Sequence, residues 1–191
     1  MYAYCDGNPV MKVDPDGTWS IGYFTNLLKV NKELYEAYMS QNCYAFAIGH
    51  SGRINPGDIS GTACDYSLNS VRDAVFADLK KLGRNYKELT EAEAKKYKLK
   101  KGERMIAFRV SSTGNDYHFM ATNGKNWFHK LGAGTGEMAS LPMKLIGNPW
   151  GVGAWINSGH AIVKENGKYT LRFWKVRSNG YSGETKYIVY W

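Results

Sequence analysis

The sequence predicts an α+β fold in which N-terminal helices pack on an antiparallel β-sheet formed by the second half of the chain. Two observations predict it. From about residue 26 to residue 99 apolar side chains recur at helical spacing, whereas from residue 104 onward they alternate with a period of two. Helices followed by a run of strands are typical of α+β domains. The 191 residues, of which 43% are apolar, suffice for one domain with a hydrophobic core.

Three helices are expected before the strands. The first covers about residues 26–39, where apolar residues fall three or four positions apart on one helical face. The second covers residues 68–82, between a serine that can cap its N-terminus and a glycine that can end it. The third covers residues 90–99 and opens with Thr90 and Glu93, which have the spacing of a capping box.

Six segments with strand composition follow these helices. Each combines aromatic or β-branched residues with a period of two and is bounded by turn residues. The expected strands are residues 104–110, 117–122, 126–130, 160–163, 169–176 and 185–191.

The second and third of these strands predict a hairpin that pairs two histidines. Asn123-Gly124 is a strong signal for a two-residue turn, because both central residues of a type I′ turn need positive φ. That turn places His118 directly opposite His129, with Cβ atoms about 5 Å apart on one sheet face. The other face then carries the expected core residues Tyr117, Phe119, Ala121 and Phe128.

The segment "QNCYAFAIGH" (41–50) supplies a candidate nucleophile. Cys43 is expected in the first turn of a short helix, where the dipole and free N–H groups favour a thiolate. A thiolate, an imidazole base and a residue that orients the base form a nucleophilic triad. We therefore predict Cys43 as nucleophile, His118 as base and His129 as orienting residue. Asn42 either lends an oxyanion donor or only caps the helix.

Other cysteines and histidines compete less well for these roles. Cys64 precedes a helix with no histidine-bearing strand close after it, so we expect a packing role. Cys5 lies in the segment 1–19, which differs from the rest of the chain, and we expect no chemical role for it. His160, in a Gly-His pair at the start of a strand, is the alternative base. Cys43 and the two hairpin histidines are also residue types that ligate zinc, but no spaced ligand pattern supports a metal, and we expect no metal or other cofactor.

The chain carries a formal net charge of +8 and has a pI of about 9.3. Such a charge suits an acidic partner, so a nuclease that uses His118, His129 and a lysine as general acid and base is an alternative function. An ADP-ribosyltransferase is a further alternative, although its Glu-x-Glu motif is missing, and an inactive binding domain is a third. No membrane span or signal peptide is visible, so we expect no stable membrane insertion.

Residues 1–19 differ from the rest of the chain, with turn signals and no periodic apolar face. They carry a Tyr-x-Tyr, Asn-Pro-Val, Asp-Pro-x-Gly pattern formed by Tyr2, Tyr4, Asn8, Pro9, Val10, Asp14, Pro15 and Gly17. This pattern resembles the end of the core of RHS (YD-repeat) proteins, where a β shell is followed by a variable C-terminal toxin. The resemblance implies that residues 20–191 are a toxin domain, released from the shell by self-cleavage near the motif.

A second resemblance covers residues 41–132. The order of cysteine and two strand histidines is similar to that of papain-like and NlpC/P60 hydrolases, in which the cysteine opens a helix packed on an antiparallel sheet. The motifs "NCYAFA", "PGDISG", "DYHF" and "WFHKLG" resemble those of bacterial and phage domains described as insecticidal-toxin-like, with Phe128 in place of a usual serine. We expect Asn42, Tyr44 and Trp127 to contribute to the oxyanion hole or to substrate binding.

These resemblances imply a secreted or injected effector that acts in a target cell as a cysteine-dependent amide hydrolase. A peptidase, a peptidoglycan amidase and a deamidase remain open, so the substrate is either a protein or peptidoglycan. The implied partners are the RHS shell before release and a cognate immunity protein, which we expect to be acidic because the chain is basic.

Overall fold

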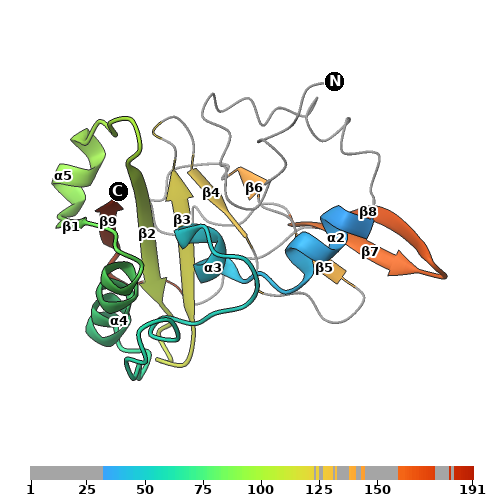
Figure 1. Cartoon of the computed structure of the whole chain (residues 1–191), viewed down its shortest axis with the longest axis horizontal. Coiled ribbons are helices and arrows are strands. Elements are labelled where there is room, and N and C mark those ends of the chain that lie inside the picture. Colours follow the sequence, from blue (N-terminus) through green and yellow to red (C-terminus); the bar gives the residue numbers. More distant parts are fainter. Residues whose placement is uncertain are drawn as a thin grey trace.

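The computed structural model describes residues 32–122, 124, 127–130, 132, 138–140, 143–144, 159–174, 181 and 183–191. The described residues form helices and antiparallel strands, as the change in apolar spacing predicts (Figure 1). The helices are α2 (Lys32–Met39), α3 (Cys43–Ile48), α4 (Leu68–Lys81) and α5 (Glu91–Lys96). The RHS-like segment 1–19 lies outside the described residues.

The strands form two sheets, which corrects the expectation of one. A six-stranded sheet has the order β1-β9-β2-β3-β4-β6, and a three-stranded sheet has the order β5-β7-β8. The first contains β1 (Tyr86–Leu89), β2 (Arg104–Val110), β3 (Tyr117–Thr122), β4 (Trp127–His129), β6 (Met143–Lys144) and β9 (Lys186–Tyr190). The second contains β5 (Met138–Ser140), β7 (Gly159–Glu165) and β8 (Lys168–Trp174).

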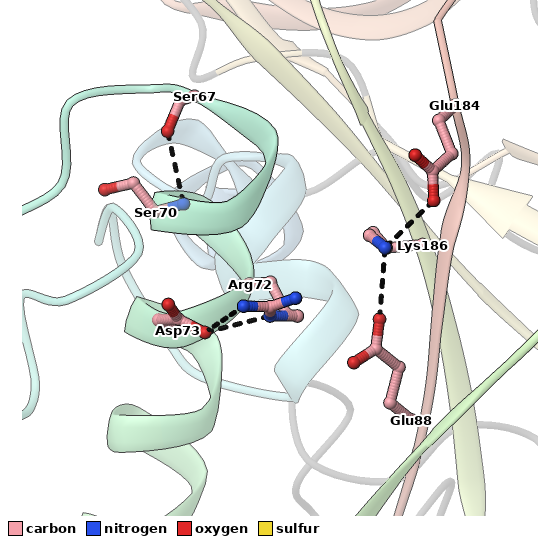
Figure 2. A network of polar contacts seen from close by, with 7 residues as sticks. All are labelled: Ser67, Ser70, Arg72, Asp73, Glu88, Glu184 and Lys186. Atoms are coloured by element: carbon pink, nitrogen blue, oxygen red, sulfur yellow. Dashed lines mark hydrogen bonds and ion pairs between the residues drawn. The ribbon is translucent and has the colours of Figure 1, made fainter.

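The helix ends follow the predicted caps. The Ser67 hydroxyl accepts a hydrogen bond from the Ser70 backbone N–H at 3.3 Å (Figure 2). Thr90 and Glu93 form both bonds of the capping box at the start of α5. This helix ends at Lys96, three residues earlier than predicted, because Tyr97 already has extended backbone angles.

Two strands of the six-stranded sheet, β1 and the two-residue β6, were not expected, and neither was β5 of the three-stranded sheet. Only four residues long, β1 is too short to show a clear period, and it pairs antiparallel with the C-terminal strand β9. β9 in turn pairs with β2, so the end of the chain lies inside the sheet. Lys186 on β9 forms ion pairs with Glu88 of β1 and with Glu184, at 3.4 and 2.9 Å (Figure 2). These exposed carboxylates add little stability, since water screens such pairs.

Both faces of the six-stranded sheet are covered by apolar side chains. Helices α3 and α4 lie on one face, where Val71, Val75 and Leu79 contact the main core cluster. On the other face a second cluster surrounds Ala94 of α5. Figure 1 shows α3 lying in front of β3, so this helix covers the strand that carries His118.

The hairpin of β3 and β4 forms, but its register differs from the prediction. His129 lies opposite Met120 rather than His118, and Trp127 lies opposite Thr122, so four residues rather than two connect the strands. The pairing has shifted by two residues. Because side chains alternate faces with a period of two, this shift leaves both histidines on the same face, as diagonal neighbours. The predicted core face is confirmed: Tyr117, Phe119, Ala121 and Phe128 are all buried.

The three-stranded sheet contains the alternative base. β7 and β8 form a hairpin whose turn residues, Asn166 and Gly167, both have positive φ. The backbone of His160 pairs with Phe173 in this hairpin, whereas its side chain lies outside what the structure describes. Helix α2 packs beside this sheet, where the Tyr35 and Tyr169 rings lie 5.2 Å apart. In the part of the chain that the structure describes, no helix is long and apolar enough to cross a membrane.

Candidate active site

Cys43 is the first residue of α3, as predicted, and Asn42 caps this helix. The Asn42 Oδ1 accepts a hydrogen bond from the Ala45 N–H at 2.9 Å. Its Nδ2 donates to the Ile54 carbonyl at 2.7 Å, so both ends of the amide are held. Gly49 ends the helix with φ of 70°, a conformation that a side chain would strain. The two hydrogen bonds of the Asn42 side chain therefore show that this residue caps α3 and fixes where the helix begins.

Replacement of Asn42 by alanine is expected to lower the free energy of unfolding by about 1–2 kcal/mol, because the cap and the Ile54 bond are both lost. Asn42→Asp keeps the cap acceptor and loses only the donor, so it should cost less. Urea unfolding followed by circular dichroism measures both. An alanine variant as stable as wild type would contradict a capping role.

The Cys43 thiol lies beside an unpaired stretch of the β3 edge. The Ser111 N–H donates to the Asp116 carbonyl where β2 and β3 meet. In an antiparallel pair, residues that hydrogen-bond to the partner strand alternate with residues that do not. Tyr117 and Phe119 therefore direct their backbone groups away from β2. β4 pairs with β3 only from Met120 onward. In the space before that residue, the Cys43 Sγ donates to the Tyr117 carbonyl at 3.9 Å.

His118 lies between the two backbone groups that meet the thiol. Sγ contacts the Tyr117 carbonyl, and the Phe119 N–H is the second largest influence on the Cys43 pKa. The thiol and the backbone of His118 are therefore neighbours, although Cys43 and His118 are far apart in the sequence. The short edge of β4 leaves room for this approach.

The two histidine rings contact each other. The His118 Nε2 and the His129 Nδ1 lie 3.1 Å apart, and the ring planes meet at 74°. Both side chains are buried, with exposed fractions of 5% and 2%. Burial lowers the pKa of His118 to about 4 and also lowers the pKa of His129, which the neighbouring His118 lowers further. Both imidazoles are therefore neutral at pH 7, and one nitrogen of the pair donates to the other.

The expectation of a thiolate favoured by the helix is not met. Burial raises the pKa of the Cys43 thiol to about 11, and the Phe119 and Tyr44 N–H groups lower it by less than burial raises it. The side chain is only 5% exposed and belongs to the main core cluster. A helix of six residues has few aligned peptide dipoles, so desolvation dominates. At neutral pH the resting group is a thiol.

Lys130, which follows His129, was not predicted as a site residue. Its side chain is fully buried, and Nζ donates to the backbone carbonyl of Gln41, two residues before Cys43. Burial lowers the pKa of this amine to about 7, and the nearby Cys43 opposes that change. The only sequence signal was its place in the "HKLG" motif, because a buried lysine cannot be distinguished from an exposed one by residue type.

Tyr181 and Asp116 form a second polar contact beside the histidines that was not predicted. The Tyr181 ring lies 5.7 Å from the His118 ring, and its hydroxyl donates to the Asp116 carboxylate. Arg109 holds the same segment by donating to the Tyr181 carbonyl at 3.1 Å. No motif marks Tyr181, which reaches His118 only through the tertiary fold.

Two residues expected to contact substrate lie in apolar clusters. Tyr44 is fully buried; its ring packs on Phe119 at 4.8 Å, and its hydroxyl donates to Asp78 at 2.8 Å. The structure thus places Tyr44 in the core, with no surface for substrate contact. Trp127 is half-buried against the second cluster, on the same sheet face as His129.

Asp78 is the common hydrogen-bond acceptor for residues of two sequence motifs. This buried carboxylate on α4 accepts hydrogen bonds from the Gly57 and Ser60 N–H groups and from the Tyr44 hydroxyl, each at 2.8 Å. Gly57 has φ of 96°, and a Cβ there would lie 2.0 Å from the Thr62 carbonyl oxygen. Parts of the "NCYAFA" and "PGDISG" motifs therefore build the fold rather than the site.

The remaining candidates from the sequence are Cys64, Cys5 and His160. Cys64 is half-buried against the main core, in line with a packing role, and Cys5 lies outside the described residues. His160 belongs to the other sheet. Among the described residues, no three His, Cys, Asp or Glu side chains are grouped so that they could hold a metal ion.

Comparison with known proteins gives no assignment: no family model matches the chain, and neither a curated protein nor a solved structure is significantly similar to it.

Proposed function

We propose that this protein is a cysteine-dependent amide hydrolase with an NlpC/P60-like or papain-like arrangement of Cys43, His118 and His129. One observation carries the proposal. A buried thiol lies against the strand edge that holds His118, and the His118 imidazole is within hydrogen-bond distance of a second imidazole, 3.1 Å away. A nucleophile, a base and a residue that orients the base are thus supplied by adjacent elements.

The proposed reaction begins from a neutral thiol and a neutral imidazole. His118 Nε2 is engaged with His129, so Nδ1 is the nitrogen that takes the Cys43 proton as Sγ attacks the amide carbon. The tetrahedral intermediate collapses when the imidazolium returns this proton to the leaving amine. Water, deprotonated by His118, then cleaves the thioester and restores the thiol. The low pKa of His118 keeps its base form fully populated at pH 7.

His129 supports this cycle as an orienting residue. Because Nδ1 of neutral His118 must be free to take the proton, its Nε2 carries the hydrogen and donates to the His129 Nδ1, and this bond fixes the ring plane of the base. When His118 becomes an imidazolium, its Nε2–H donates to the His129 Nδ1. An acceptor imidazole at this position then stabilises the charged base that the first step creates.

The N-terminal motif supports a biological setting for this chemistry. We infer a toxin that follows an RHS core, acts in a target cell on a protein or peptidoglycan amide, and is neutralised in its producer by an immunity protein. The formal charge of +8 favours an acidic immunity partner. Release from the RHS shell and delivery by a secretion system belong to the same proposal.

Growth of cells that express the chain in the target compartment tests the function. Wild type should stop growth, whereas Cys43→Ser and His118→Ala, at matched protein levels, should each permit it. Cys64→Ser is the matched control, because it removes a half-buried thiol that the proposed triad does not use, and it should remain toxic. The measurement is the number of surviving colonies after induction.

The same experiment separates the amide hydrolase from the nuclease alternative. A toxic Cys43→Ser variant, beside a harmless His118→Ala variant, would contradict a thiol nucleophile. Nucleic-acid degradation would then be measured, since the basic chain could hold phosphates without needing the thiol.

A further inference from the structure

Lys130 lies where a positive charge would act on the candidate nucleophile. It follows β4 directly after His129, its side chain is fully buried, and its Nζ donates to the Gln41 carbonyl. Gln41 precedes the capping residue Asn42, so the amine lies at the end of α3 that carries Cys43. A buried lysine is rare unless a partner compensates for its lost hydration.

Several described groups act electrostatically on the thiol. Asp116, Tyr117, Tyr181 and Lys130 interact with Cys43, and the neighbouring His118–His129 pair is uncharged at pH 7. Of these, Asp116 disfavours a thiolate and Lys130 favours it. Among the described residues that act on the thiol in this way, Lys130 is the one that can bring a positive charge.

A buried thiolate needs such a partner. Proton transfer to His118 leaves a negative sulfur in a core position that is 5% exposed, where an unpaired charge is costly. We propose that Lys130 is a positioning residue whose ammonium, held by the Gln41 carbonyl, stabilises the Cys43 thiolate during attack. A role of Lys130 in catalysis rests on the proposed function. Its effect on the Cys43 thiolate can be measured without any substrate.

The proposal gives the thiol a distinctive titration. When Cys43 and Lys130 together lose one proton, the product is either a neutral thiol beside a neutral amine or a thiolate beside an ammonium. The ratio of these two forms does not change with pH. The ammonium favours the thiolate, so the thiolate fraction of the wild type should begin to rise at a lower pH than that of a variant without this charge. Without the ammonium, the thiol should ionise only at higher pH.

The test is the rate at which iodoacetamide alkylates Cys43 between pH 6 and 10, followed by mass spectrometry of the Cys43 peptide. Lys130→Met keeps a long side chain and removes the charge; it should lower the rate at pH 7.5 by about ten-fold or more and move the rise in rate to higher pH. Lys130→Arg keeps a positive charge and should retain the rate. Cys64 in the same samples reports the ordinary reactivity of a cysteine.

An unchanged Cys43 profile in a folded Lys130→Met variant would overturn the proposal. If that variant does not fold by circular dichroism, Lys130→Arg decides: a wild-type rate at pH 7.5 supports the proposal, and a ten-fold loss in the folded arginine variant overturns it. Toxicity that survives Cys43→Ser would instead refute the proposed function, and it would leave the alkylation result unaffected.

Discussion

Replacement of Asp78 by alanine is expected to lower the free energy of unfolding by about 3–5 kcal/mol, which is enough to unfold many domains of this size. The carboxylate accepts from Gly57 and Ser60 in the loop and from the Tyr44 hydroxyl on α3. Alanine leaves all three donors buried without an acceptor, and each such group costs about 1–3 kcal/mol. The loss should therefore exceed that of a typical core substitution.

Asp78→Asn provides a graded comparison. Its amide oxygen can replace Oδ2, which accepts from both Tyr44 and Gly57, while its NH₂ group faces the Ser60 N–H and loses that bond. The asparagine variant should lie between wild type and alanine. The matched control is Asp73→Ala on the same helix, where an exposed carboxylate pairs with Arg72 (Figure 2) and substitution should change stability by less than about 0.5 kcal/mol.

Urea unfolding at pH 7 measures all three variants. A difference of less than about 1 kcal/mol between Asp78→Ala and wild type would show that water or rearranged backbone satisfies the three donors, and the network would then have no structural role. Because Tyr44 and Gly57 belong to two different motifs, the result also tests whether those motifs serve the fold.

Acidification from pH 6 to pH 5 is expected to lower the free energy of unfolding by up to about 1.4 kcal/mol for each of the two buried histidines. The sign follows from the pKa directions. Burial lowers the native pKa of His118 to about 4, below the ordinary value of 6.5, and lowers that of His129 as well. The unfolded chain therefore binds protons below pH 6.5 that the native protein does not, and stability falls until pH approaches the native values.

Lys130 does not produce this slope. The native pKa of Lys130, lowered by burial to about 7, makes stability rise with pH between about 7 and the ordinary lysine value of 10.5. It contributes no change between pH 5 and 6, where the lysine is protonated in both states. His118→Gln should remove about half of the loss on acidification, because glutamine keeps a hydrogen-bonding side chain without titrating.

Chemical denaturation at pH 7, 6 and 5 checks the prediction. Equal slopes for wild type and His118→Gln would mean that the imidazole is protonated in the native protein at pH 5, in conflict with its burial. A slope present in wild type and halved in the variant would support a neutral, buried pair as the resting state of the proposed base.

Most local structure was predictable because its causes lie within a few residues. Ser67 caps α4 and the Thr90–Glu93 capping box opens α5, both through bonds that span three residues. β2 and β3 have the predicted bounds because the alternation of apolar side chains covers their full lengths. The four-residue β1 was missed, since its partner β9 lies about a hundred residues further along the chain.

The candidate site was predictable only in part. The period of two placed both histidines on one face, and this survived the error in register, because a shift of two residues preserves the face. The turn residues alone did not fix the loop length. Whether the Cys43 thiol would be ionised also depended on its burial, which the sequence of a short helix does not specify.

The sequence by itself determined where most helices and strands lie, which side chains of the hairpin point together, and which cysteine opens a helix. Only the tertiary structure decided that Cys43 meets the β3 edge 74 residues away, that Lys130 is buried beside it, and that Asp78 joins three segments. The physical reason is the separation along the sequence over which each interaction acts. Caps and alternation act through neighbouring residues, whereas burial and contact between distant side chains depend on how the helices pack on the sheet.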